Sequence, residues 1–326
     1  MKAVVILGAG AAAPFGVPTL QRLFQDHYAR AQLKKDPFLH MKLQDLFWGP
    51  RGFNLDTSHL SLTVEEILTI VRDSDQQDYK APPLLGTEAD HFRKSLYVLI
   101  KRAVYDGKSS DGRCLNPLIE FARKNFKQTT WASFNWDCIF EASFYYSSCP
   151  DPRGRYNPQV VIDLHNWHNS YGNHLFLKLH GGVNWWFEDG NIVYLPWGAQ
   201  PDLDSRWQGY EQGKVGGHPV ILEPSFYKYE DAVFALLIPQ WQRFVESLLG
   251  ADIVVIVGYS LPEADVETRR ALTIGFQGNT TARYVVINSS EWACNRYTRI
   301  LGRARLRCEQ ATIEDASGRL GELLLS

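Results

Sequence analysis

Apolar residues occur in short unbroken runs along the chain, and most of these runs end at glycine or at a polar residue. The first run, Ala3–Leu7, precedes Gly8 and Gly10, and apolar residues at helical spacing follow in Thr19–Ala31. Continuous apolar runs are typical of strands covered on both faces, so the pattern predicts a doubly wound, parallel (Rossmann-like) α/β sheet. The other predicted strands are Thr129–Phe134, His174–Leu179, Pro219–Leu222, Asp252–Val257 and Arg283–Ile287.

A long stretch between the first strand-helix unit and Thr129 has no strong strand signal. Apolar residues recur there at helical spacing in Val64–Val71, Ala89–Tyr105 and Leu115–Lys124. We therefore expect a mainly helical insertion at residues 36–127, which forms a small domain.

The rest of the chain, residues 1–35 and 128–326, is expected to form one domain around the parallel sheet. Within it, Asn184–Gly217 is rich in Gly, Trp, Asp and Pro, a composition that favours a loop or hairpin excursion. A chain of 326 residues, 45% of them hydrophobic, can bury a core of this size.

Charge gives no reason to expect a polyanionic partner. The 34 basic and 36 acidic residues leave a formal net charge of -2, so neither nucleic acid nor an anionic membrane is indicated. No apolar stretch approaches the ~20 residues that cross a bilayer. The apolar run near the N-terminus is short and is broken by Gly8, Gly10 and Pro14, so we interpret it as a strand and its turn, and expect a soluble protein.

No two of the five cysteines have C-x-x-C spacing, so we expect neither a disulfide framework nor a zinc module. The reducing cytoplasm is the location that this pattern favours. His165 and His168 have no cysteine or carboxylate at ligand spacing, and we interpret them as polar loop residues rather than metal ligands. The cysteines are Cys114, Cys138, Cys149, Cys294 and Cys308.

The turn Gly8-Ala9-Gly10 directly follows the first predicted strand. Glycines let the backbone approach a nucleotide phosphate and expose amide N–H groups to it, so this turn is suited to phosphate binding. The full G-x-G-x-x-G pattern is absent, because Ala13 stands at the third position and Pro14 follows it. A tight turn without a ligand explains the same residues equally well.

Polar side chains also follow two later strands. Asn135 and Asp137 come after Thr129–Phe134, and His180 follows His174–Leu179. Open α/β sheets bind ligands at the carboxyl ends of their strands, so these side chains are candidates for one shared site. Structural roles stay open for each of them, because asparagine and aspartate often cap helices and a single histidine is usually structural.

Two further strands end in small or polar residues. Gly258 and Ser260 follow Asp252–Val257, and Asn288 follows Arg283–Ile287. A hydroxyl, an amide and a glycine turn can receive a phosphate or a ribose. We interpret the strand ends together as one ligand site rather than as independent accidents of turn chemistry.

In their order along the chain, these segments resemble the motifs of the sirtuins, and the resemblance covers most of the chain outside the insertion. It is most specific in Lys178–Trp185, Ile221–Lys228 and Gly258–Asp265, which look like the sirtuin-like NAD-hydrolysing effectors of bacterial anti-phage defence. The sirtuin-like segments are Gly8-Ala9-Gly10, Gly16-Val17-Pro18, Phe134-Asn135-Trp136-Asp137, Leu179-His180-Gly181, Gly258-Tyr259-Ser260 and Ile287-Asn288.

The resemblance implies NAD as the substrate and assigns roles to single residues. Asn135 and His180 match the two residues essential for NAD hydrolysis, and Asp137 matches the one that contacts the nicotinamide amide. The positions that match the rest of the NAD site are Gly8, Ala9, Gly10, Pro18, Gly258, Ser260 and Asn288.

These residue types suit cleavage of the nicotinamide–ribose bond. Nicotinamide is already a cationic leaving group, so the reaction mainly needs stabilisation of an oxocarbenium-like centre and a positioned acceptor. The Asn135 amide can orient water or ribose hydroxyls, and the His180 imidazole can take a proton from either. We therefore expect an NAD glycohydrolase, with an anti-phage role that is implied by the resemblance alone.

Other activities stay open, namely protein deacylation, ADP-ribosyl transfer and non-catalytic sensing of NAD or ADP-ribose. Two departures from the sirtuin pattern weaken deacylation: Ala12 replaces the usual serine, and Thr19-Leu20-Gln21 replaces the Asp-Phe-Arg of deacylases. The presence of both Asn135 and His180 argues against a pure sensor, because binding alone does not require this pair.

Regulation is expected to involve a further protein surface. Relatives of this kind often assemble with themselves or with a second protein such as a HerA-type ATPase, and no sensor domain is recognisable in the sequence. We therefore expect a homo-oligomer, a separate regulatory partner, or both. We interpret the basic stretch Arg296–Arg307 as solvated surface and Trp185-Trp186 as packing.

Overall fold

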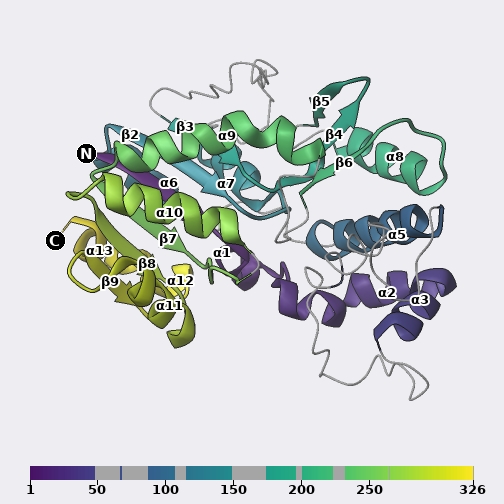
Figure 1. The fold of residues 1–326 in the computed structure, drawn as a ribbon, viewed down its shortest axis with the longest axis horizontal. Coiled ribbons are helices and arrows are strands. Elements are labelled where there is room, and N and C mark those ends of the chain that lie inside the picture. The colour runs from purple at the N-terminus through teal and green to yellow at the C-terminus, as the bar shows by residue number, and fades with distance from the viewer. Residues whose placement is uncertain are drawn as a thin grey trace.

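Two sheets organise the molecule, a parallel sheet of six strands and an antiparallel sheet of three. They lie side by side in the ribbon of Figure 1, with both labelled chain ends next to the parallel sheet. The computed structural model describes residues 1–47, 67, 87–106, 115–148, 174–195, 200–222, 232–263 and 265–325.

The parallel sheet has the strand order β3-β2-β1-β7-β8-β9. Side chains of β1 alternate between its two faces, because Val5 packs in one core while Val4 and Ile6 pack in the other. The order changes direction between β1 and β7, which makes this the switch point of a doubly wound sheet. The strands are β1 (Lys2–Leu7), β2 (Gln128–Ser133), β3 (His174–Lys178), β7 (Ile253–Val257), β8 (Arg283–Ile287) and β9 (Leu306–Glu309).

Helices cover both faces of this sheet (Figure 1). α9, α10 and α11 share a core with Val4 and Ile6, whereas α6, α7, α12 and α13 share a core with Val5. The predicted doubly wound α/β class is therefore confirmed. None of the described helices is both long enough and apolar enough to cross a bilayer. Their bounds are α6 (Asn116–Asn125), α7 (Ile139–Ser148), α9 (Ala232–Leu249), α10 (Val266–Gly278), α11 (Glu291–Leu301), α12 (Ile313–Ala316) and α13 (Leu320–Leu325).

The antiparallel sheet has the order β5-β4-β6 and corrects one expectation. Pro219–Leu222 is predicted to join the parallel sheet, but this run forms β6 (His218–Ile221), which pairs antiparallel with β4 (Gly181–Glu188). A continuous apolar run indicates burial and does not identify the neighbouring strand. β9 is the converse case: its residues are only half-buried, so its sequence has no apolar run and does not predict a strand.

The excursion that Asn184–Gly217 predicts is a hairpin with a helix attached. β4 continues into β5 (Asn191–Tyr194) through Asp189 and Gly190, whose φ angles of 49° and 79° suit a two-residue hairpin turn. α8 (Gln200–Glu211) follows the hairpin and is the part that the composition does not predict.

A helical part lies at the end of the molecule beyond the carboxyl ends of the parallel strands (Figure 1). It consists of α2 (His27–Lys35), α3 (Pro37–Phe47) and α5 (Thr87–Val104), which contact one another. The helices predicted at Ala89–Tyr105 and Leu115–Lys124 correspond to α5 and α6. The pattern at Val64–Val71 lies outside the described residues except for Ile67, and the insertion boundaries at 36 and 127 stay a prediction.

The helical segment predicted at Thr19–Ala31 is broken in the structure. A 3-10 helix occupies Leu20–Gln25, and α2 then begins at His27. Asp26 caps α2, because its side chain accepts the backbone N–H groups of Tyr28 and Ala29.

Ion pairs connect this helical part to α8. Lys101 on α5 is buried, with its Nζ 2.8 Å from Asp204 Oδ1 and 2.6 Å from Asp106 Oδ1. At the next residue of α5, Arg102 Nη2 lies 3.3 Å from Glu211 Oε2. These ion pairs therefore attach the helical part to the helix of the hairpin excursion.

The cysteines correct a second expectation. Cys294 on α11 and Cys308 on β9 are joined by a disulfide, although they are 14 residues apart and have no paired spacing. The parallel pairing of β9 with β8 brings this strand beside α11, which no local pattern predicts. The cysteines consequently give no support for a reducing compartment.

Candidate active site

The turn after β1 packs directly against the turn after β7. Gly8 donates its backbone N–H to Val257 O at 3.0 Å, and Gly10 donates to Gly258 O at 2.8 Å. A Cβ atom at Gly10 would lie 2.9 Å from Gly258 Cα, and one at Gly258 would lie 2.1 Å from Ala11 N. Gly258 also has a φ of +61°, so only glycine fits this approach of two backbones. The predicted phosphate turn thus lies at the switch point of the sheet.

Asn135 connects the end of β2 to the end of β1. Its Nδ2 donates to Gly8 O at 3.0 Å, and its backbone N–H donates to Ser133 Oγ at 3.2 Å. The side chain is half-buried. These two bonds fix the amide beside the glycine turn and leave Oδ1 as an acceptor for water or a ligand hydroxyl.

His180 belongs to a buried group of polar and aromatic side chains. It is 4% exposed, and its Nε2 lies 3.5 Å from Asp265 Oδ2. The Tyr259 hydroxyl donates to the same carboxylate oxygen. Phe134 stacks on the Tyr259 ring at 4.6 Å and meets the His180 ring edge-on at 5.1 Å, while Trp241 lies 6.2 Å from the imidazole. We call His180, Asp265, Tyr259, Phe134 and Trp241 the histidine cluster.

Asn288 is attached to this cluster through the backbone of Tyr259. Its Nδ2 donates to Tyr259 O at 3.3 Å, and its Oδ1 accepts the N–H of Ser290 at 3.0 Å. The side chain therefore shapes the turn from β8 into α11. Pro18 and Ser260 are half-buried, and none of the contacts described above includes either side chain.

Asp137 lies in a second buried polar group. Its Oδ1 accepts the N–H of Ile139 at 2.8 Å, which is the capping role that the sequence leaves open. Lys178 Nζ donates to the backbone oxygen of Asp137 at 2.6 Å, to Glu141 Oε1 at 2.5 Å and to Asn184 Oδ1 at 3.4 Å. We call Lys178, Asp137, Glu141 and Asn184 the lysine cluster.

Burial controls the protonation of both clusters. It raises the pKa of Asp137 to about 6, against the opposing effect of Lys178. Burial lowers the pKa of Lys178, but Glu141 and the other neighbours outweigh it, so the net pKa is raised and the ammonium stays charged. Burial and then the Asp265 carboxylate raise the pKa of Tyr259 well above 10, which keeps its phenol a neutral donor.

The sequence does not predict three of these residues. Lys178 sits within an apolar strand, and the sequence gives no role to Tyr259 or Asp265, although both lie in the sirtuin-like segment Gly258–Asp265. Asp265 is also the residue before α10, where aspartate is common as a helix cap. Its position beside His180 depends on how the turn after β7 lies against the turn after β3, and no local pattern encodes that arrangement.

Acid-base and hydrogen-bonding groups dominate this edge of the sheet. The imidazole and the carboxylate can exchange protons, whereas the phenol and the amide can form hydrogen bonds. Among the described residues there is no group of three His, Cys, Asp or Glu side chains that could hold a metal ion.

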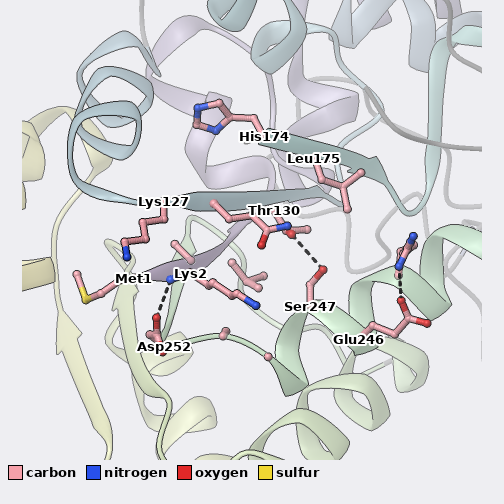
Figure 2. Close-up of a pocket in the computed structure, with 15 residues that line it drawn as sticks. Met1, Lys2, Lys127, Thr130, His174, Leu175, Glu246, Ser247 and Asp252 are labelled. Atoms are coloured by element: carbon pink, nitrogen blue, oxygen red, sulfur yellow. Dashed lines mark hydrogen bonds and ion pairs between the residues drawn. The ribbon is translucent and has the colours of Figure 1, made fainter. Parts of the chain in front are cut away.

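A hollow with a volume of about 860 Å³ lies at the opposite edge, at the amino ends of β1, β2 and β3 (Figure 2). None of the predicted site residues lines it. Several of its polar groups bond to one another: Lys2 N donates to Asp252 Oδ2 at 2.7 Å, and Thr130 Oγ1 donates to Ser247 Oγ at 3.0 Å. The residues predicted for NAD binding gather at the carboxyl edge instead.

Comparison with solved structures identifies the fold. Sir2Tm bound to a propionylated peptide matches with a TM-score of 0.50 and 11% identity, over 99% of this chain and 92% of that one. A sirtuin studied for substrate affinity matches at 0.51 and 11%, over 99% and 93%. A mutant Sir2 homologue in complex with 2'-O-acetyl-ADP-ribose matches at 0.51 and 13%, over 98% and 90%.

No family model and no curated protein matches the chain. The likeness to solved structures nevertheless extends over nearly the whole length of each partner. The chain therefore has a sirtuin-like fold.

Proposed function

We propose that this protein hydrolyses NAD to nicotinamide and ADP-ribose. The observation that carries the proposal is the hydrogen bond from Asn135 to Gly8 O, which joins the predicted catalytic amide to the predicted phosphate turn. The sirtuin-like fold supports the choice of ligand, since one similar structure is a complex with 2'-O-acetyl-ADP-ribose.

In the proposed binding mode, the NAD phosphates lie against the Gly8–Gly10 and Gly258 turns, and the nicotinamide end lies near Asn135. The bond between the ribose carbon and the pyridinium nitrogen breaks, and its electron pair neutralises the leaving nicotinamide. Water then attacks the oxocarbenium-like carbon, and His180 accepts the proton that this water loses. Contact of Asp137 with the nicotinamide amide would use Oδ2, because Oδ1 is bonded to Ile139.

Protein deacylation is the main alternative, because the similar structures include a complex with a propionylated peptide. The two reactions differ in the acceptor, which is water in hydrolysis and an acyl oxygen in deacylation. We expect water, because Thr19-Leu20-Gln21 stands where deacylases carry Asp-Phe-Arg.

The experiment supplies NAD with and without acetyl-lysine peptide and identifies the products by mass. We expect nicotinamide and ADP-ribose in similar amounts in both samples, and release that is at least about 100-fold slower in Asn135→Ala and in His180→Gln. Nicotinamide release that depends on the peptide, together with O-acetyl-ADP-ribose, would replace hydrolysis by deacylation. NAD binding without turnover would instead support the sensor.

We further propose that the enzyme acts in the cytoplasm as an anti-phage effector that depletes NAD, and that self-assembly or a regulatory protein controls it. An unrestrained NAD hydrolase would harm its own cell, so a restraint is required. The helical part beyond the carboxyl edge is the surface proposed to cover the site (Figure 1). Assays of the protein alone and with co-encoded proteins such as a HerA-type ATPase test this, and constant turnover across all samples would exclude control by such a partner.

A further inference from the structure

We propose that Asp265 is a positioning residue that holds the imidazole of His180 with its proton on Nε2, which leaves Nδ1 to accept a proton. The inference rests on the proposed function for its catalytic consequence, but the contact between the two side chains stands on geometry alone. Asp265 Oδ2 lies 3.5 Å from His180 Nε2, and both side chains are at least 95% buried.

The place of Asp265 in the fold does not explain its residue type. Asp265 is the residue before α10, where an aspartate ordinarily accepts backbone N–H groups of the first turn. Within the described residues, its side chain makes no such bond to α10. The carboxylate instead accepts the Tyr259 hydroxyl and faces His180. The helix N-terminus still favours its negative charge.

The surroundings make this pair sensitive to protonation. Two tyrosines, Tyr259 and Tyr297, interact with the carboxylate, and burial together with Asp265 raises the pKa of both well above 10, so both phenols stay neutral. Phe134 and Trp241 are apolar neighbours of the imidazole, so water screens the pair weakly. When His180 accepts a proton, an imidazolium faces a carboxylate at short range, which stabilises the charged form. Asp265 therefore orients the imidazole and increases its basicity.

The first test compares Asp265→Asn with Glu263→Gln, the same chemical change in the same turn. Glu263 has a side chain that is 75% exposed and pairs with Arg296, not with the histidine cluster. We expect Asp265→Asn to lower kcat for nicotinamide release about 100-fold with KM changed less than about 3-fold. Glu263→Gln should retain wild-type kcat. Near-UV circular dichroism and the melting temperature confirm that each variant is folded.

The second test reads His180 without catalysis. The protein contains 9 histidines, and comparison with His180→Gln assigns the signals of His180 in nitrogen NMR of protein labelled at histidine. We expect the Nε2–H form in the wild type, and an imidazole pKa at least about one unit lower in Asp265→Asn than in Glu263→Gln. Equal titration in both variants would overturn the positioning role, even if the wild type releases nicotinamide. A coupled titration in a protein that releases none would leave the positioning role intact and remove the proposed function.

Discussion

The two polar clusters on either side of Leu179 each contain a basic side chain and a carboxylate, but the surroundings of the basic side chain differ. In the lysine cluster, the Lys178 ammonium is fully buried and donates to one backbone oxygen and two side-chain oxygens. In the histidine cluster, His180 faces a carboxylate at 3.5 Å within an aromatic surround. Residues two positions apart at the end of one strand are thus committed to different tasks.

The Lys178 ammonium and the His180 imidazole differ in the groups that they contact and in whether they can take up a proton. Lys178 holds the backbone of the loop that carries Asn135 and Asp137, and its charge is satisfied in the resting fold. The imidazole of His180 can take up a proton, and a carboxylate is already in place to stabilise the result. We therefore expect changes in the lysine cluster to alter stability, and changes around His180 to alter turnover.

The largest expected effect is that of Lys178→Met on folding. Removing the ammonium leaves Glu141 as an uncompensated buried charge, which costs about 3–5 kcal/mol of unfolding free energy. Lys124→Met makes the same chemical change at an exposed site on α6 and should cost under about 0.5 kcal/mol. Urea denaturation of both variants measures this, and a similar small loss in each would erase the distinction between the clusters.

Asn135→Ala should lower nicotinamide release by about 10²–10³-fold, because the amide is expected to act on the transition state. Its stability cost should be only about 1 kcal/mol, since the side chain is half-buried and, within the part of the chain that the structure describes, makes one hydrogen bond, to Gly8 O. The matched control is Asn125→Ala, which removes a 2.8 Å amide bond to Phe121 O on α6. If both variants lose activity equally, Asn135 has no special role in turnover.

A smaller effect is expected on the pH dependence of the unfolding free energy, through Asp137 in the lysine cluster. Asp137 has a pKa raised from 3.8 to about 6, so folding favours its protonated form. As pH rises between these values, the unfolded chain releases the proton first and the native state loses at most about 3 kcal/mol. Asp137→Asn should flatten this fall, because an amide does not titrate in this range, and the amide oxygen can still accept the Ile139 N–H. Unfolding free energies from pH 4 to 7 test it, and an unchanged slope would assign the fall to other groups.

The apolar runs predict most of the parallel sheet, because a strand covered on both faces must be apolar wherever it pairs. β9 is only half-buried and has no apolar run. β6 does have an apolar run, but it belongs to the antiparallel sheet. Sequence patterns describe how deeply a segment is buried. Which strands pair with it depends on contacts between segments that are far apart in the sequence.

The same limit applies to the site. Asn135 and His180 stand at predicted strand ends, and the sheet topology explains why such residues gather at one edge. Asp265 precedes a helix, and its sequence position suits an ordinary cap as well as a partner for His180. Only the packing of α10 distinguishes the two roles. The disulfide between Cys294 and Cys308 likewise depends on packing that no local sequence pattern predicts.

The contact between Gly10 and Gly258 has a consequence for how this sequence can diverge. Each turn occupies the space that a side chain on the other would need, although about 250 residues separate them. Neither glycine can therefore be replaced unless the other backbone moves, and a compensating change would have to arise in both turns at once. Such a constraint retains two separate glycines, whereas it places no restriction on the residues around them. The geometry of the two turns can therefore stay the same while the overall sequence identity falls.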